Sequence, residues 1–219
     1  MTLRFAHRGG LDSGAGWNTR AAFVDAVARG CDVESDVRLS LDGDPVLVHD
    51  FIRGLVVPSL WRTSWLERRG VVPLARVFDL LGDRHLSLDV KQPSAAERVL
   101  SVLPADRSRV WLVHDSLEVL SRIRSLDASV RLVHEARVRE IDPATHAATL
   151  AQRGIDAQNT HWSNWSPALL DSARAADVLA FGSIANTAAD LSVAASKGLD
   201  AIYSDHLALL TAAFPDSTM

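Results

Sequence analysis

The first fifty residues contain two histidines and two acids at spacings that could support metal-assisted hydrolysis. His7 ends one apolar run, Glu34 and Asp36 lie two residues apart in another, and His49 ends a third. Side chains two apart in a strand point to the same face, so Glu34 and Asp36 share one surface. Carboxylates beside histidines, which titrate near neutral pH, predict proton donors and acceptors around a cation.

A later segment repeats the two-residue spacing with an acid and a cation. Asp89 and Lys91 share one face of the predicted strand 86–91. A third acid close to Glu34 and Asp36 would be repelled unless a cation compensated it. Three carboxylates without thiolates favour Mg²⁺ or Ca²⁺ over zinc, with Mn²⁺ as a further candidate. The alternatives are a solvated strand edge at Glu34 and Asp36 and a surface ion pair between Asp89 and Lys91.

Strand-like and helix-like segments alternate along residues 1–219, which predicts one domain. The expected strands are Arg4–His7, Asp32–Leu39, Val46–His49, Leu86–Lys91, Val110–His114, Val130–His134, Ile155–Asn159, Val178–Ser183 and Ala201–Ser204. The expected helices are Thr19–Arg29, Leu74–Leu81, Ala95–Leu103, Leu117–Ser125, Ala144–Arg153, Ala168–Ala175 and Ala188–Lys197. This alternation favours an α/β fold, a (β/α)8 TIM barrel, with an open doubly wound sheet as the alternative. Since a barrel of this type has about eight strands, one of the nine segments should lie outside it.

The irregular region is expected around the second and third strands. Asp42-Gly43 separates them by too few residues for a crossover helix, which predicts a tight hairpin. Folding symmetrically about that turn would place Asp36 opposite His49. If the third strand ran parallel instead, both residues would still lie at strand carboxyl ends, where barrel enzymes carry their chemistry.

Composition and charge argue against several classes of function. A net charge of −4, with two lysines and scattered arginines, argues against binding nucleic acid, which needs clustered Lys and Arg. No apolar run approaches the roughly 20 residues of a membrane helix, so stable membrane insertion is not expected. The single Cys31 cannot form an internal disulfide, and we expect a buried strand residue in a reducing, cytoplasmic compartment. The oligomeric state stays open.

Several stretches together resemble the glycerophosphodiester phosphodiesterases. They are His7-Arg8-Gly9, Asn18-Thr19 with Ala21-Ala22-Phe23, Gly30 to Ser40, Asp42 to Asp50, Leu86 to Lys91, and the ending Gly198 to Asp205. The resemblance covers nearly the whole chain and is most specific in the first fifty residues; between Val110 and Ala180 only the rhythm of the elements matches.

The resemblance implies a barrel enzyme that cleaves a small-molecule glycerophosphodiester to an alcohol and glycerol phosphate. It implies that Glu34, Asp36 and Asp89 bind the divalent cation. It also implies that His7 and His49 are the acid–base pair and that Arg8 and Lys91 contact phosphate. These roles agree with the residue chemistry, because a phosphodiester is anionic and its leaving alkoxide needs a proton. Attack by water and attack by a substrate hydroxyl, through a cyclic phosphate, both remain open.

Three departures from the family pattern bear on substrate choice. Trp17 replaces a glutamate and would add an aromatic wall at the site mouth; Asp89 replaces a longer glutamate; Phe181 replaces a tryptophan and keeps an apolar contact for substrate. These changes leave two alternatives, a phospholipase D-type enzyme acting on lysophospholipids or sphingolipids, and a relative that binds phosphodiesters without cleaving them.

Other polar residues at strand ends have no role in the resemblance. They are His114-Asp115, His134-Glu135, Asn159 and Asn186. For His114 and His134 we expect hydrogen bonds to neighbours at the barrel mouth rather than a place in the pocket lining. Trp162 and Trp165 could cage a choline-like group by cation–π attraction, but packing of a loop against the rim is the favoured interpretation.

Overall fold

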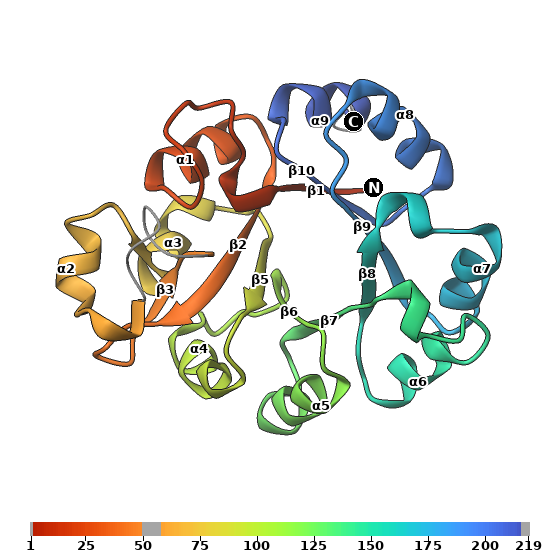
Figure 1. Ribbon diagram of the computed structural model, residues 1–219, viewed down its shortest axis with the longest axis horizontal. Helices are drawn as coiled ribbons and strands as arrows, with labels where there is room; N and C mark the ends of the chain where they lie inside the picture. The colour runs from red at the N-terminus through yellow and green to blue at the C-terminus, as the bar shows by residue number, and fades with distance from the viewer. Residues whose placement is uncertain (1, 50–57, 216–219) are drawn as a thin grey trace.

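Eight parallel strands close into a barrel in the computed structural model, which describes residues 2–49 and 58–215 (Figure 1). They are β1 (Leu3–Ala6), β2 (Asp32–Leu39), β5 (Leu86–Val90), β6 (Val110–His114), β7 (Arg131–Glu135), β8 (Ala157–His161), β9 (Leu179–Ser183) and β10 (Ala201–Ser204). The ring closes because β1 pairs with both β10 and β2. The predicted TIM barrel is therefore confirmed, and the open doubly wound sheet is wrong.

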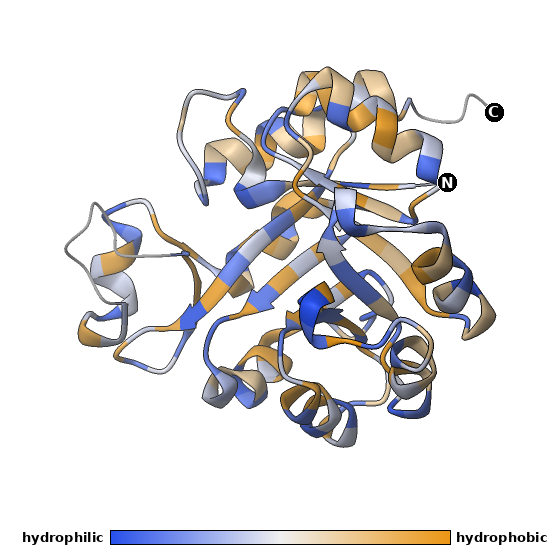
Figure 2. Cartoon of the chain, turned by 45° about the vertical axis from the view of Figure 1, so that its right-hand side comes forward, coloured by the Kyte–Doolittle hydropathy of each residue, from blue (hydrophilic) through white to orange (hydrophobic). Residues whose placement is uncertain are grey.

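Helices follow most of the barrel strands and cover the outside of the ring (Figure 1). They are α1 (Arg20–Ala28), α3 (Leu74–Leu81), α4 (Ala96–Val102), α5 (Leu117–Leu126), α6 (His146–Gln152), α7 (Pro167–Ala175), α8 (Ala188–Lys197) and α9 (Leu207–Ala213). Side-chain oxygens of Thr19, Ser116, Ser166 and Thr187 accept hydrogen bonds at the amino ends of four of them. The helices carry both hydrophobic and hydrophilic positions, as expected for a layer between a core and solvent (Figure 2).

A short side branch leaves the ring at β2. It contains β3 (Pro45–Leu47), β4 (Val72–Pro73) and the short helix α2 (Thr63–Glu67), and it lies to the left of the ring in Figure 1. β3 is antiparallel to β2, so the predicted hairpin is confirmed and β3 is the predicted strand outside the barrel. The parallel alternative is wrong. β4, α2 and α9 were not predicted.

The register of this hairpin differs by one residue from the prediction. Val37 pairs with Leu47, and the Val48 N–H donates to the Asp36 carbonyl over 2.9 Å, so Asp36 lies opposite Val48 rather than His49. The cause is the loop: the Ser40 N–H donates to the Asp44 carbonyl over 2.9 Å, which leaves a three-residue loop centred on Asp42. Gly43, at φ 79°, supplies the left-handed residue of such loops.

Strand β8 lies two residues later than predicted. It begins at Ala157 rather than at Ile155, because the Ile155 N–H still donates to the Leu150 carbonyl of α6 over 2.9 Å. The buried Ile155 side chain belongs to the packing behind that helix. An apolar residue at a helix end therefore looked like the start of a strand.

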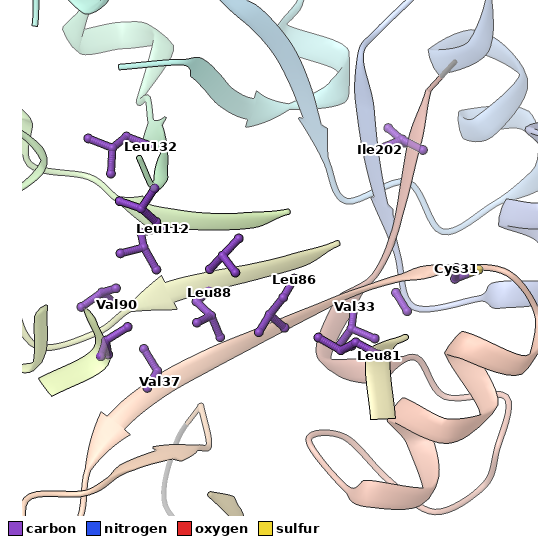
Figure 3. Packing of buried hydrophobic residues seen from close by; sticks show 14 of the residues in the cluster. Cys31, Val33, Val37, Leu81, Leu86, Leu88, Val90, Leu112, Leu132 and Ile202 are labelled. Atoms are coloured by element: carbon purple, nitrogen blue, oxygen red, sulfur yellow. The ribbon is translucent and has the colours of Figure 1, made fainter. Parts of the chain in front are cut away.

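The apolar core has two layers separated by the strands. The outer layer packs strand side chains such as Val33, Leu86, Leu88 and Leu112 against the helices (Figure 3). Cys31 belongs to it, and burial raises the pKa of its thiol to about 11, which makes it an unreactive core residue as expected. The inner layer fills the barrel with the side chains of Phe5, Trp111, Val113, Val133, Ala157, Phe181, Ala201 and Tyr203.

Alternation along each strand decides which residues face the barrel interior. In β2, Val33 and Val37 join the outer layer, so Glu34 and Asp36 point inward, and in β5 Leu88 and Val90 likewise leave Asp89 on the inner face. None of the helices within the described ranges has the length and apolar content needed to span a bilayer.

Candidate active site

A cavity of about 200 Å³ opens at the carboxyl ends of the barrel strands. Seven of the nine predicted site residues line it: His7, Arg8, Glu34, Asp36, His49, Asp89 and Lys91. The rest of the described lining is Ser87, Val113, Glu135, Asn159, Ser183, Ile184 and Tyr203. Residues from all eight barrel strands or the positions that follow them, and one from the side branch, therefore converge on one polar cavity.

The acids form a group on two neighbouring strands. Asp36 of β2 is the register partner of Asp89 of β5, and Glu34 lies one inward position deeper. Burial and the charge of Asp36 raise the pKa of Glu34 to about 8. Burial also raises the pKa of Asp89, against the opposing effect of Lys91. These carboxylates therefore face one another in a place that disfavours their combined negative charge.

Lys91 supplies positive charge to that group. Its Nζ lies 3.0 Å from Asp36 Oδ1 and also donates a hydrogen bond to Asp89 Oδ2. Burial acts to lower the pKa of Lys91, but the charges of Asp89 and Asp36 outweigh it and raise the pKa. The ammonium therefore bridges two of the three predicted metal ligands.

The donor set suits a hard divalent cation although no cluster is preformed. Among the side chains of residues 2–49 and 58–215, no three His, Cys, Asp or Glu residues are grouped so as to hold an ion. The Lys91 ammonium between Asp36 and Asp89 accounts for this, since it takes the place that a cation would share with them. Asp36 Oδ2 is buried without a hydrogen bond, which together with the raised pKa of Glu34 leaves oxygen atoms suited to Mg²⁺, Ca²⁺ or Mn²⁺.

The tight turn after β1 depends on two glycines. Gly9 and Gly10 have φ of 82° and 78°. A Cβ on Gly9 would lie 2.9 Å from Ala22 Cβ, and one on Gly10 would lie 2.7 Å from the Leu207 side chain. Helices α1 and α9 therefore press against the turn, and only glycine fits both positions.

The turn directs Arg8 toward the acids. Arg8 has φ 53°, a left-handed conformation that is strained for a residue with a side chain. Its N–H donates to Glu34 Oε2 over 2.9 Å, and its Nε lies 3.4 Å from Asp36 Oδ2. The hydrogen bond to Glu34 thus stabilises the strained backbone of Arg8, and the guanidinium lies beside Asp36.

The carboxylate of Asp205 orients His7. His7 Nδ1 hydrogen-bonds Asp205 Oδ1 over 2.8 Å, and Asn186 Nδ2 donates to Asp205 Oδ2 over 2.5 Å. Burial alone would lower the pKa of His7, but the hydrogen bond to Asp205 and the charge of Glu34 outweigh it and raise the pKa. With Nδ1 engaged, Nε2 faces the cavity acids, 3.9 Å from Glu34 Oε2.

His49 reaches the cavity from the side branch. Its Nε2 lies 4.0 Å from Asp36 Oδ1, and the Arg38 Nε donates to its backbone carbonyl over 2.8 Å. The one-residue change of register therefore does not separate His49 from Asp36. Asp50, which follows it, lies outside the described residues.

The two aromatic residues predicted to contact substrate are placed differently. Trp17 is 47% exposed and its ring lies 5.1 Å from the Arg8 guanidinium carbon, so it covers Arg8 from outside the cavity lining. Phe181 is fully buried among Phe5, Trp111 and Tyr203 inside the barrel. This position does not support the predicted contact between Phe181 and substrate.

The loop that contains Trp162 and Trp165 does not form the aromatic cage that was the less favoured alternative. Trp165 is 1% exposed, and its indole N–H donates to the Phe181 carbonyl over 2.7 Å, so the loop packs on the barrel as favoured. His134 Nε2 bonds the Asp115 carbonyl over 3.0 Å, and His114 Nδ1 accepts from the Ser116 N–H over 2.8 Å. Both histidines are thus bonded to neighbours as expected, but His134 also lines a second cavity.

Sequence reasoning assigned no role to several residues that build the site. Asp205 and Asn186 orient His7, while Glu135 and Asn159 line the cavity at the ends of β7 and β8. Partial burial raises the pKa of Glu135, and the negative charge of Asp89 raises it further. In the sequence, the position of these residues at the carboxyl ends of predicted strands was the feature that could have indicated a place in the site.

Known proteins resemble this chain in part of the sequence and in the fold. Residues 7–64 match the model of the Glycerophosphoryl diester phosphodiesterase family. A glycerophosphodiester phosphodiesterase from Thermotoga maritima has a similar structure, with a TM-score of 0.84 at 21% identity over 97% of this chain and 98% of that one. A phosphodiesterase from Oleispira antarctica, solved with sn-glycerol-3-phosphate as product, has a TM-score of 0.83 at 20% identity over 99% and 98%. No curated protein matches.

Proposed function

We propose that this chain, whose residues 7–64 match the glycerophosphoryl diester phosphodiesterase family, is a member of that family and hydrolyses a glycerophosphodiester to an alcohol and glycerol phosphate. The observation that carries the proposal is the convergence of two histidines and two cations on the acids of β2. His7 and His49 lie 3.9 and 4.0 Å from Glu34 and Asp36, and Arg8 and Lys91 line the same cavity.

Each group has a task that the phosphodiester chemistry requires. Arg8 and Lys91 neutralise the phosphate, whose negative charge otherwise repels a nucleophile. One histidine removes the proton of the attacking hydroxyl or water, and the other donates a proton to the leaving alkoxide. Asp205 holds His7 with Nε2 toward the cavity. When bound by Glu34, Asp36 and Asp89, a divalent cation supplies Lewis-acid polarisation of a phosphoryl oxygen.

The direct test is release of glycerol phosphate from purified protein. Glycerophosphocholine, glycerophosphoethanolamine and glycerophosphoglycerol are incubated with Mg²⁺, Ca²⁺ or Mn²⁺, and the product is measured enzymatically. We expect turnover of at least one substrate. Tight phosphodiester binding without product under all three metals would instead support the non-catalytic alternative.

The lipid alternative receives no support from the cavity. A lysophospholipid or sphingolipid needs an apolar groove for its acyl chain, yet the aliphatic residues in the described lining are Val113 and Ile184 alone. The polar walls favour a water-soluble diester. Comparable rates with and without an acyl chain on the same head group would agree with this, and a strong gain from the chain would contradict it.

Asp205→Asn is expected to lower kcat at least tenfold and to move one limb of the pH profile to lower pH. The charge and hydrogen bond of Asp205 contribute to the raised pKa of His7, so their loss lets burial lower that pKa. Asp171→Asn on the exposed surface of α7 is the control. Profiles of kcat/KM between pH 5 and 10 check the shift; an unchanged limb would contradict the role of Asp205.

Trp17→Ala is expected to raise KM about two- to fivefold and to change kcat less. An exposed cation–π contact contributes about 0.5–1 kcal/mol, and its loss frees the Arg8 guanidinium from the ring. Trp61→Ala removes an exposed tryptophan that stacks on Trp65 and serves as control. Steady-state kinetics on one glycerophosphodiester measure KM and kcat for both variants. An unchanged KM for Trp17→Ala would contradict the prediction.

A further inference from the structure

The wall of the cavity formed by β7 and β8 has polar groups that the proposed reaction does not use. Glu135 of β7 and Asn159 of β8 are register partners, and both line the cavity. In the order of strands around the ring, β7 and β8 lie across from β1 and β2, which carry His7 and Glu34. This wall therefore faces the part of a substrate that projects away from the acids of β2.

Both side chains offer hydrogen-bond acceptors without partners. Asn159 is 5% exposed, and its Oδ1 has no hydrogen bond within the described part of the chain. The Glu135 carboxylate makes neither a hydrogen bond nor an ion pair with any described side chain, although the charges of Asp89 and Lys91 act on it. A buried amide oxygen normally has a partner. A ligand group that donates hydrogen bonds would supply one to both side chains.

A second cavity of about 380 Å³ adjoins the first at Glu135. Glu135 belongs to the lining of both cavities, and the second also contains Asp115, His134, Arg137, Glu140 and His146. Arg137 is the cation of this set, and its guanidinium nitrogens lie 3.7 Å from Asp115 Oδ2 and 3.5 Å from Glu140 Oε1. The lining therefore keeps an excess of carboxylates.

The two histidines of the second cavity do not offset this negative charge. His146 Nε2 and His134 Nδ1 are 3.2 Å apart in a hydrogen bond. Burial and the neighbouring His146 lower the pKa of His134 to about 4, and burial lowers the pKa of His146. Both rings are neutral at pH 7, so the cavity attracts a cation.

We propose that Glu135, together with Asn159, binds the ammonium group of the substrate's alcohol, so that this enzyme prefers glycerophosphodiesters of a primary amino alcohol. The inference rests on the proposed function. A primary ammonium donates three hydrogen bonds, which suits acceptors such as Glu135 and Asn159. A quaternary ammonium is instead bound by aromatic faces, and the only aromatic rings in the described lining of the second cavity are the two histidines.

Charge balance favours a cationic over a neutral head group. The catalytic cavity contains four acids against the cations Arg8 and Lys91, so with a bound divalent ion and all four acids ionised its charges would cancel. The phosphodiester then adds one negative charge. An ammonium on the leaving alcohol restores the balance, which a neutral glycerol head group does not.

The test compares kcat/KM for glycerophosphoethanolamine, glycerophosphocholine and glycerophosphoglycerol. We expect the ethanolamine diester to exceed the other two about tenfold, and Glu135→Gln to remove most of that preference. Glu118→Gln, on the exposed face of α5 outside both linings, should keep it. Thermal unfolding of each variant verifies folding.

Equal kcat/KM for the ethanolamine and glycerol diesters overturns the inference, and so does equal kcat/KM for the choline diester. A preference that survives in Glu135→Gln overturns the role of that residue. These results differ from failure of the proposed function, in which none of the three diesters releases glycerol phosphate.

Discussion

His49→Ala is expected to lower kcat by about 10²–10⁴-fold, the usual contribution of a general acid or base. The imidazole Nε2 lies 4.0 Å from Asp36 Oδ1 inside the cavity, and alanine leaves no group to transfer a proton there. His7→Ala should have an effect of the same order, because the proposed reaction needs one histidine as the base and the other as the acid. Initial rates of glycerol phosphate release measure both losses.

The control for both histidine variants is His161→Ala. His161 ends β8, lies outside the cavity lining, and its Nδ1 hydrogen-bonds the Ser163 hydroxyl over 2.8 Å. Its activity should stay within about twofold of the wild type, since no proton transfer is routed through it. If His49→Ala or His7→Ala kept similar activity with a native unfolding temperature, acid–base catalysis by the pair would be wrong.

Chelation of divalent ions should reduce turnover at least a hundredfold, and added Mg²⁺, Ca²⁺ or Mn²⁺ should restore it. Without an ion, the phosphate faces Glu34, Asp36 and Asp89 with only Arg8 and Lys91 to offset them. Asp36→Asn should raise the metal concentration for half-maximal activity, because it removes one charge at the centre of the group. Activity is measured after EDTA treatment and then across a metal titration.

Asp25→Asn, on the surface of α1 beside Arg29, is the matched control for Asp36→Asn and should leave the metal titration unchanged. Full activity in excess EDTA would show that Lys91 and Arg8 suffice for charge neutralisation. Calorimetry of metal binding by the two variants separates loss of the ion from loss of catalysis.

The half of the site on β2 and β5 could be predicted because it depends on local rules. Alternation in a strand fixes the common face of Glu34 and Asp36, and parallel pairing brings Asp89 beside Asp36 in register. The barrel itself followed from the regular order of strands and helices. These are properties of short segments and of their sequence along the chain.

The other half depends on closure of the ring, which short segments do not encode. Asp205 hydrogen-bonds His7 across 198 residues because β10 pairs with β1. Phe181 was predicted to contact a ligand, yet it fills the barrel interior. Whether an aromatic residue lines a cavity or fills a core is decided by residues distant in sequence.

The pairing of β2 with β3 in the side branch differs from the prediction by one residue. One residue more or less in the loop at Asp42 decides whether Asp36 opposes Val48 or His49. The sequence contains the turn signal but not the loop length that tertiary packing selects.

The attachment of β3 gives the two histidines different mechanical support. The barrel closes through β1 and β2, and His7 directly follows β1, a strand of the closed ring. His49 instead follows β3, a three-residue strand that pairs with the barrel strand β2 from outside the ring. Fraying of that branch would withdraw His49, a proposed proton-transfer group, while Arg8 and Lys91 stayed in place. With that role for His49, substitutions in the branch would lower turnover without lowering affinity for a phosphodiester. The rate could then change during evolution through the branch while the barrel stayed the same.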